Sequence, residues 1–235
     1  MKRFARLMAA AAAFAFLTGA VAPDPDNPTC PAKPDWGPAA AMTVTPAVRN
    51  GAHVLLLEGR VDSGLPQRLK AAIEADDQIV EIWIRSAGGD AAAGNAAGKV
   101  VRSFPGMITR IPTGWTCFSA CNFVFMGGTA RVVEPGGVFM VHMFTHTGQR
   151  DVIQETIAEG TNATAGLIGE IEQSSALLAS DDNDFLIRMG VSRKLLTEVM
   201  YRQQAVKSAE NPSTRYCLTQ DEVLRYNVMN GQGAG

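Results

Sequence analysis

The sequence predicts an α/β protein whose strands run mostly parallel. Short apolar runs, bounded by Gly, Pro and Asn, alternate along the chain with longer segments whose apolar residues recur at helical spacing. This alternation is typical of parallel sheets, because two parallel strands need a crossover connection between them. One of the boundaries, Gly88-Gly89, lies between a predicted buried strand and a predicted helix, which is a common place for a ligand-binding turn.

Residues 1–22 predict a secretory signal peptide. Lys2, Arg3 and Arg6 form a basic start, an apolar run follows, and small residues stand at positions 20–22. The apolar run is too short for a membrane-spanning helix, although an uncleaved anchor is the alternative. We therefore expect a periplasmic or secreted protein with no membrane span after cleavage.

Charge argues against a nucleic-acid partner. The chain of 235 residues has a formal net charge of −2, and removing the basic signal segment makes it more negative. The sequence contains no run of Lys or Arg that would form a basic patch.

A proline-rich stretch over residues 23–41 predicts an extended linker, because proline at this density disfavours both helix and strand pairing. Cys30 could tie this linker to the rest of the chain. Residues 42–230 contain the alternating pattern and predict one α/β domain, and residues 231–235 predict a flexible tail.

The first half of this domain predicts strands over residues 53–58, 79–84 and 107–111, with helices over 64–75 and 91–104. The second half begins with a segment that is apolar on every face, as a buried helix is. Its predicted elements are a helix over 118–126, strands over 130–133 and 138–142, helices over 151–180, 182–189 and 192–201, a strand over 215–218 and a helix over 221–226.

Four cysteines are present: Cys30, Cys117, Cys121 and Cys217. In an oxidising compartment they predict disulfides, and four cysteines allow three connectivities that the sequence does not separate. A zinc site is the alternative. We favour disulfides, because no Cys or His pair elsewhere has the spacing of zinc ligands. No metal and no cofactor are expected.

Ser119 is the candidate nucleophile, since it lies on a small-residue turn that leads into the apolar helix. The simpler interpretation is that Ser119 only caps this helix, because serine is a favoured N-cap residue. A serine hydroxyl needs a general base, and histidine suits that task near neutral pH. Among the three histidines, His142 ends a predicted strand just after the helix, His146 could substitute for it, and His53 lies far upstream.

Three motifs in this order resemble the Clp protease proteolytic subunit (ClpP) and its crotonase-like relatives, most closely exported ClpP-like proteins of bacteria. The motifs are Ile84-Arg-Ser-Ala-Gly-Gly89, Cys117-Phe-Ser-Ala-Cys121 and Gly137-Val-Phe-Met-Val-His142. The resemblance covers roughly residues 55–229. It implies a fold of repeated β-β-α units with a long helix after the catalytic histidine.

The resemblance also implies the roles of individual residues. Ser119 matches the nucleophile and His142 the general base, while the backbone N–H groups of Gly89 and Ala120 match the oxyanion hole. The family carries an Asp shortly before its closing strand, whereas residues 213–215 here contain no carboxylate. Asn211 or Glu210 could take its place, or the hydroxyl of Ser213 or Thr214 could orient His142 instead.

Together these features predict an exported serine hydrolase, a peptidase acting on peptide or protein substrates. Because the family Asp is missing, a non-catalytic binding or assembly protein on the same fold is the alternative. An acyl-CoA enzyme of the crotonase type is a weaker possibility, since the chain offers no basic cluster for the phosphates. By analogy with the family, we expect a homo-oligomer that pairs through the helix over 151–180.

Overall fold

The computed structural model describes residues 22–147 and 149–231. The predicted signal peptide, except for its last residue, and nearly all of the predicted tail lie outside the described residues. Within the described part, no helix combines the length and the apolar character needed to cross a bilayer.

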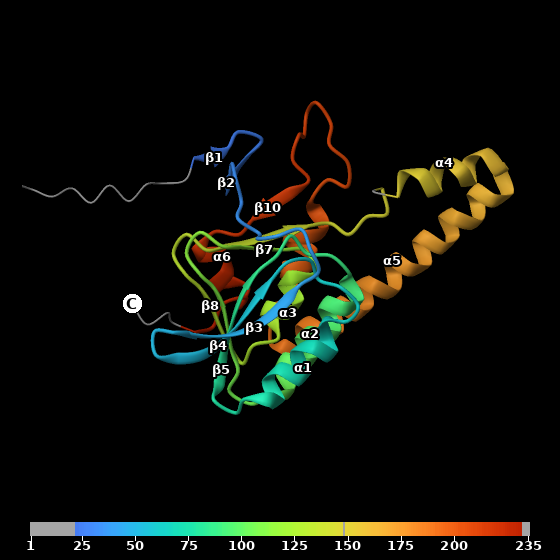
Figure 1. Cartoon of the computed structure of the whole chain (residues 1–235). Coiled ribbons are helices and arrows are strands. Elements are labelled where there is room, and N and C mark those ends of the chain that lie inside the picture. The colour runs from blue at the N-terminus through green and yellow to red at the C-terminus, as the bar shows by residue number, and fades with distance from the viewer. Residues whose placement is uncertain (1–21, 148, 232–235) are drawn as a thin grey trace, which may run out of the picture.

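The main sheet has five strands in the order β3-β4-β5-β6-β8 (Figure 1). Their bounds are β3 Thr43–Arg49, β4 Ala52–Glu58, β5 Ile79–Arg85, β6 Ile108–Ile111 and β8 Ala130–Val133. β4, β5, β6 and β8 run parallel, and only β3 is antiparallel to its neighbour. The predicted α/β class with mostly parallel strands is confirmed.

β3 was not predicted as a strand, although the sequence contains its signal. β3 and β4 form a hairpin through Asn50 and Gly51, whose φ angles are 52° and 80°. Asn-Gly with two positive φ angles is the preferred two-residue hairpin turn, because its twist matches that of the flanking strands.

A smaller sheet has the order β10-β9-β7 and lies beside the first. It is made of β7 (Thr116–Phe118), β9 (Val138–His142) and β10 (Arg215–Cys217). β7 and β9 are parallel, whereas β10 is antiparallel to β9 and pairs Arg215 with His142. This sheet therefore brings together three segments that are far apart in the sequence.

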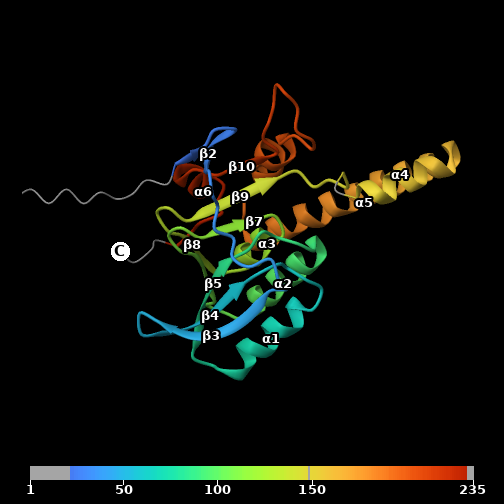
Figure 2. The ribbon, with the colours of Figure 1, turned by 45° about the horizontal axis from the view of Figure 1, so that its top comes forward.

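Three helices cover one face of the main sheet, as Figure 2 shows. They are α1 (Leu65–Ala75), α2 (Ala91–Ser103) and α3 (Cys121–Met126). α3 is buried along its whole length, as its apolar sequence predicts. The last helix, α6 (Gln220–Arg225), begins at a capping box made by Thr219 and Glu222.

The helices after His142 differ from the prediction in where they break. α4 (Arg150–Glu159) and α5 (Thr161–Met189) are separated at Gly160, whose φ of 109° is incompatible with a helix. α5 then continues without interruption, so the predicted break between residues 180 and 182 is wrong. The predicted helix over 192–201 is a π-helical turn, Leu195–Val199, followed by a 3₁₀ turn, Met200–Arg202.

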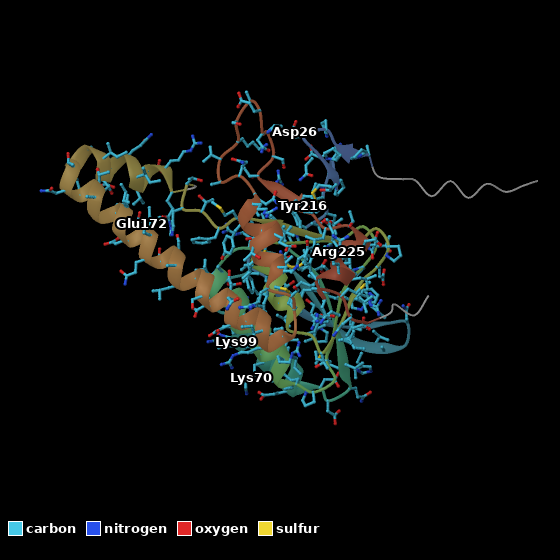
Figure 3. The ribbon with its side chains drawn as sticks, turned by 180° about the vertical axis from the view of Figure 1, so that it is seen from behind. Asp26, Lys70, Lys99, Glu172, Tyr216 and Arg225 are labelled. Carbon is cyan, nitrogen blue, oxygen red and sulfur yellow. A yellow bond between two sulfur atoms is a disulfide. The ribbon has the colours of Figure 1, made fainter. Side chains whose placement is uncertain are left out.

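α4 and the first part of α5 form an arm that projects from the body (Figures 1 and 3). α4 has no buried residue, and the buried residues of α5 begin only at Asp182. Figure 3 shows Glu172 on this arm, with its side chain pointing into solvent. The expected long helix after His142 is present, and its C-terminal quarter is the part that packs in the core.

Two arginines hold the C-terminal end of α5. Arg131 is buried and donates hydrogen bonds to the carbonyl oxygens of Val228 and Gly128, both at 2.9 Å. Arg102 donates to the same Gly128 carbonyl at 2.8 Å, and both side chains reach the Met189 carbonyl. Burial and the neighbouring Arg102 charge lower the pKa of Arg131 to about 10, so its side chain remains a cation near neutral pH.

The proline-rich stretch forms a small hairpin, so the prediction that it makes no strand pairing is wrong. β1 (Pro23–Asp24) pairs antiparallel with β2 (Asn27–Pro31). Proline is tolerated here because the sheet has only two strands, and each strand is an edge. As expected for Cys30, a disulfide to Cys217 ties this stretch to β10.

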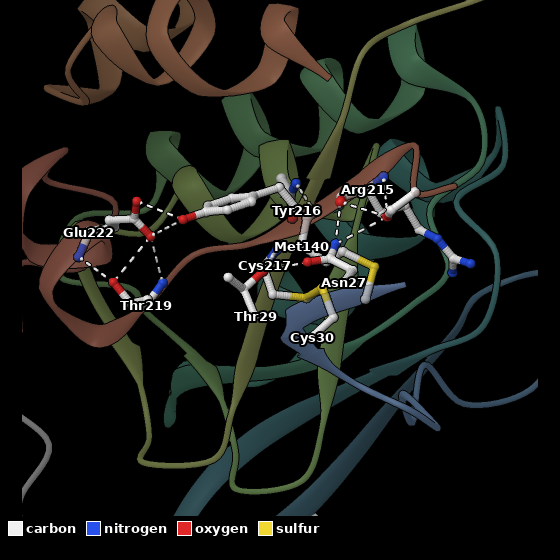
Figure 4. Close-up of a disulfide and its surroundings, with 11 residues drawn as sticks. Asn27, Thr29, Cys30, Met140, Arg215, Tyr216, Cys217, Thr219 and Glu222 are labelled. Atoms are coloured by element: carbon white, nitrogen blue, oxygen red, sulfur yellow. Dashed lines mark hydrogen bonds between the residues drawn. A yellow bond between two sulfur atoms is a disulfide. The ribbon is translucent and has the colours of Figure 1, made fainter. Parts of the chain in front are cut away.

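Figure 4 shows that polar contacts support this connection. The Asn27 side-chain amide donates to the Ser213 hydroxyl at 3.2 Å and also to the Arg215 carbonyl. The Cys217 backbone N–H donates to the Thr29 hydroxyl at 3.3 Å. The N-terminal hairpin and β10 therefore form one unit beside His142.

Candidate active site

A glycine turn follows β5 and forms one wall of the site. The Ser86 hydroxyl donates to the Gly59 carbonyl at 2.5 Å and accepts from the Gly88 N–H at 3.0 Å. Gly88 and Gly89 have φ angles of 83° and 149°, which favour glycine. Asp90 then begins α2 by accepting a hydrogen bond from the Ala93 N–H.

This turn lies directly against Ser119. The Phe118 N–H donates to the Ser86 carbonyl at 3.0 Å, so the segment before the turn is joined to β7. A Cβ added at Gly88 would come within 2.6 Å of the Ser119 Cβ. Only glycine at position 88 therefore lets the two turns approach this closely.

Ser119 occupies the turn between β7 and α3. Its φ of 59° lies in the left-handed region, an uncommon conformation for a residue with a side chain. Nucleophilic serines occupy such strained strand-to-helix turns in hydrolases, because the turn presents the hydroxyl away from the backbone. The strain at Ser119 is therefore consistent with a functional role.

The helix begins later than the sequence predicts. α3 starts at Cys121 and its N-cap residue is Ala120, which makes no side-chain cap. Phe118 belongs to β7 and Ser119 to the turn, so the simpler interpretation of Ser119 as a helix cap is wrong. A disulfide between Cys117 and Cys121 brackets the turn, and both cysteines are fully buried.

His142 ends β9 with its imidazole at Ser119. The Ser119 Oγ and the His142 Nε2 are 2.7 Å apart. In the tautomer that carries its proton on Nδ1, the imidazole accepts this hydrogen bond from the hydroxyl. Asn122, fully buried on α3, donates from its side-chain amide to the Met140 carbonyl at 2.7 Å and so fixes α3 against β9.

The surroundings of His142 favour the neutral imidazole. Burial lowers the pKa of His142 below its ordinary value of 6.5, and the Arg215 charge lowers this pKa further. A hydrogen bond with the Met143 backbone acts in the opposite direction. The Phe118 ring covers the imidazole, with 4.7 Å between ring centroids. A histidine that is neutral at pH 7 can accept the serine proton.

In the described part of the chain, no carboxylate is hydrogen-bonded to His142. Asn211 bonds through its backbone to Ser208, and the Ser213 hydroxyl donates to the Arg215 carbonyl at 3.0 Å. Across residues 22–147 and 149–231, neither these two residues nor Thr214 forms a hydrogen bond with His142. At the strand position opposite His142 stands Arg215, a cation.

The other two histidines have different partners. His53, at the start of β4, has its Nδ1 2.9 Å from a carboxylate oxygen of Asp76, which directly follows α1. His146 Nε2 lies 3.4 Å from the Ser174 hydroxyl on α5. Of the three histidines, His142 is the one whose ring contacts Ser119.

The two backbone donors expected for an oxyanion hole have no internal partner. In residues 22–147 and 149–231, no hydrogen bond is donated by the N–H of Gly89 or of Ala120. Gly89 is exposed, and the neighbouring Gly88 would place a Cβ 3.1 Å from the Ala120 nitrogen. Neither N–H group is therefore used by the hydrogen bonds of the described residues, which is what an oxyanion hole requires.

A small cavity of about 30 Å³ opens at Ser119. It has room for one or two water molecules. Its lining combines Ser119 and His142 with mostly apolar neighbours and one acid: Ala91, Ser119, Ala120, Phe123, His142, Phe144, Leu178, Asp182 and Met200.

The acid in this cavity was not recognised from the sequence. The predicted break between the helices over 151–180 and 182–189 puts Asp181, Asp182 and Asp184 at or beside a helix end, but all three lie within α5. Asp182 is only 5% exposed, whereas Asp181 and Asp184 face solvent. Helical spacing was the signal that could have identified Asp182 as buried, because it places Asp182 on the same face of α5 as Leu178, Phe185 and Met189.

Ser86, Asn122 and Arg215 were also missed. Their roles depend on contacts between distant segments, for which the local sequence has no signal. The described residues contain no cluster of His, Cys, Asp and Glu that could hold a metal ion.

The chain matches no protein-family model and no curated protein. Among solved structures, a ClpP1 point mutant from Listeria monocytogenes is similar at 15% identity, over 75% of this chain and 88% of that one, with a TM-score of 0.49. A point mutant of the membrane-bound stomatin-specific protease 1510-N is similar at 14% identity over 75% of each chain, with a TM-score of 0.45.

Proposed function

We propose that the protein is an exported serine peptidase in which Ser119 is the nucleophile and His142 the general base. The observation that carries this proposal is the 2.7 Å contact between the Ser119 hydroxyl and the His142 Nε2. The lowered pKa of His142 supports it, because the base is then neutral and ready to accept a proton at pH 7.

In this reaction the Ser119 Oγ bonds to the carbonyl carbon of the substrate while its proton moves to Nε2. The carbonyl oxygen becomes negative and accepts hydrogen bonds from the Gly89 and Ala120 N–H groups. His142 then gives its proton to the leaving amine, and the acyl–Ser119 ester remains. Water attacks this ester with the same base and releases the acid.

We expect turnover to be slow. In the best-known serine triad, replacing the acid that orients the histidine lowers kcat about 10⁴-fold. Here Arg215 stands beside His142, and in the described residues no carboxylate is hydrogen-bonded to the imidazole to orient it. The proposed machinery is thus a Ser–His pair with a backbone oxyanion hole.

Export fits the disulfides. Cys30–Cys217 and Cys117–Cys121 pair all four cysteines of the chain. Disulfides of this kind persist in oxidising compartments and are rare in the cytosol. A periplasmic or secreted location therefore belongs to the proposal.

A non-catalytic binding or assembly protein is the second candidate. The small cavity favours it, as does the finding that no carboxylate among the described residues is hydrogen-bonded to His142. Labelling with a fluorophosphonate probe distinguishes the two, since the probe reacts only with an activated serine. We expect the natural protein to be labelled and Ser119→Ala and His142→Gln not to be. Equal labelling of the natural protein and Ser119→Ala would refute Ser119 as the nucleophile.

A further inference from the structure

Asp182 is a buried acid without a partner. Its side chain lines the cavity at Ser119, and the residue is 5% exposed. No hydrogen bond or ion pair to its carboxylate is found over residues 22–147 and 149–231. A buried carboxylate normally has a hydrogen-bond donor or a cation beside it, because the loss of water is otherwise uncompensated.

This acid lines the same cavity as Ser119 and His142. Ser119 and His142 line it together with Leu178 and Asp182, which are one helical turn apart on α5. Over residues 22–147 and 149–231, the side-chain hydrogen bond found for the His142 ring is the one with Ser119, and none joins it to Asp182. Asp182 is therefore not the missing orienting acid, and its carboxylate is free for a bound group.

We propose that Asp182 selects substrates with a cationic side chain, lysine or arginine, next to the bond that Ser119 attacks. The ammonium or guanidinium group would supply the counter-charge that Asp182 lacks, while the apolar wall would contact the methylenes of the same side chain. This inference rests on the proposed peptidase function and adds its substrate class.

The cavity must widen to admit such a side chain. Phe144 and Leu178 are only half-buried, so part of the wall lies at the surface. Met200 completes the wall and is an unbranched, adaptable side chain. Rotamer changes of this kind are common when a ligand binds.

The charges around Asp182 give the selection a pH dependence. Burial and the nearby Asp181 carboxylate raise the pKa of Asp182 to about 7. The Tyr201 phenol lies close enough for Asp182 to help raise its pKa to about 12, so it is neutral in this range. His142 is neutral above its lowered pKa, and α2 and α3 present only Ala91 and Phe123. Ionisation of Asp182 is thus the charge change expected in this cavity near pH 7.

The test uses two peptidyl phosphonate diphenyl esters that modify serine irreversibly and need no turnover. One carries a lysine side chain at the residue next to phosphorus, and the other carries the neutral isostere norleucine. We expect the lysine probe to inactivate the natural protein about ten- to a hundredfold faster at pH 8, the range for a hydrogen bond between charged groups. The ratio should fall as the pH drops below 7.

Two variants complete the design. Asp182→Asn should bring the ratio close to one, and Asp184→Asn, an exposed acid on the same helix, should leave it unchanged. Labelling of Ser119 with no preference for lysine, or a preference that survives in Asp182→Asn, would overturn the specificity alone. Failure of every probe to label Ser119 would overturn the peptidase function, and the specificity with it. The pH dependence of the ratio is measured on the natural protein alone, so a variant that misfolds cannot affect this part of the test.

Discussion

At the residue scale, His142 has a cation beside it instead of an acid. Arg215 faces it across the β9–β10 pair, and the Arg215 guanidinium lies over the Trp36 and Phe118 rings at 5.7 and 6.0 Å. The positive charge disfavours the imidazolium form, so it lowers the pKa of His142. The His142 imidazole therefore stays neutral, and able to act as a base, down to a lower pH.

The first prediction follows from this contact. Replacing Arg215 with Met removes the charge and retains much of the apolar stem, so the pKa of His142 should rise. The pH profile of the fluorophosphonate reaction rate should then shift to higher pH, because the neutral base forms later. Arg49→Met, an exposed change on β3, is the control and should leave the profile in place. A profile that Arg215→Met does not move would show that the charge does not act on His142.

The second prediction concerns the stability cost of Asp182. Its pKa is 3.8 as an ordinary group and about 7 in the fold, so the folded state retains a proton that the unfolded state releases. Stability therefore falls as the pH rises from about 4 to about 7 and stays low above that range. At about 1.4 kcal/mol per pKa unit, the loss is at most about 4 kcal/mol.

Asp182→Asn should remove this part of the pH dependence. We expect urea unfolding to show the variant gaining stability over the natural protein at pH 8 but not at pH 4. Asp184→Asn should track the natural protein at both values. A variant that is equally destabilised at both pH values would indicate that Asp182 has a packing role instead.

At the element scale, the two disulfides differ in what they constrain. In the chain-entropy model, a loop as short as that closed by Cys117 and Cys121 contributes about 2 kcal/mol, whereas a loop of nearly two hundred residues contributes about 5 kcal/mol. The sequence separations here are 4 and 187. The short bridge therefore contributes less to stability, but it encloses Ser119.

The third prediction separates these effects. Replacing Cys30 and Cys217 with Ala should cost about 5 kcal/mol of unfolding free energy by this model. Replacing Cys117 and Cys121 with Ala should cost about 2 kcal/mol but should slow fluorophosphonate labelling more strongly, because the Ser119 turn is released. Urea unfolding and labelling rates on both double variants test this. A reverse order of the labelling rates would contradict it.

The elements show what the sequence could predict. The strand ending at His142 and the helix after Gly88-Gly89 follow from local periodicity and turn residues, which act over a few positions. The continuity of α5 past Asp182 does not follow from such local patterns, because several acidic residues there resemble the polar sequence found at a helix end. The start of α3 at Cys121 also escapes local reasoning, since the Cys117–Cys121 bridge and the contact with Gly88 hold Ser119 in a left-handed conformation.

At the scale of the whole molecule, the site is assembled from both sheets and the base of the arm. Three of its parts, the glycine turn, Ser119 and His142, could be predicted by their order along the chain. Asp182 and Arg215 could not, because α5 and β10 reach the site only through tertiary packing. α5 links the arm to the cavity, since Leu178 lies at the arm's base and lines the cavity.

The arm itself leads to the last prediction. Four large apolar residues on it are more than half exposed: Val152, Ile157, Ile168 and Leu177. Such exposure on a projecting helix pair typically marks an interaction surface. The homo-oligomer expected from the sequence would cover this surface, so sedimentation at micromolar concentration should show an oligomer. Burying an isoleucine contributes roughly 1.5–3 kcal/mol. The double change Ile157→Glu and Ile168→Glu should therefore weaken association at least about a hundredfold.

Leu224→Glu, at an equally exposed leucine on α6, should have no effect, and a natural protein that sediments as a monomer would rule the interface out.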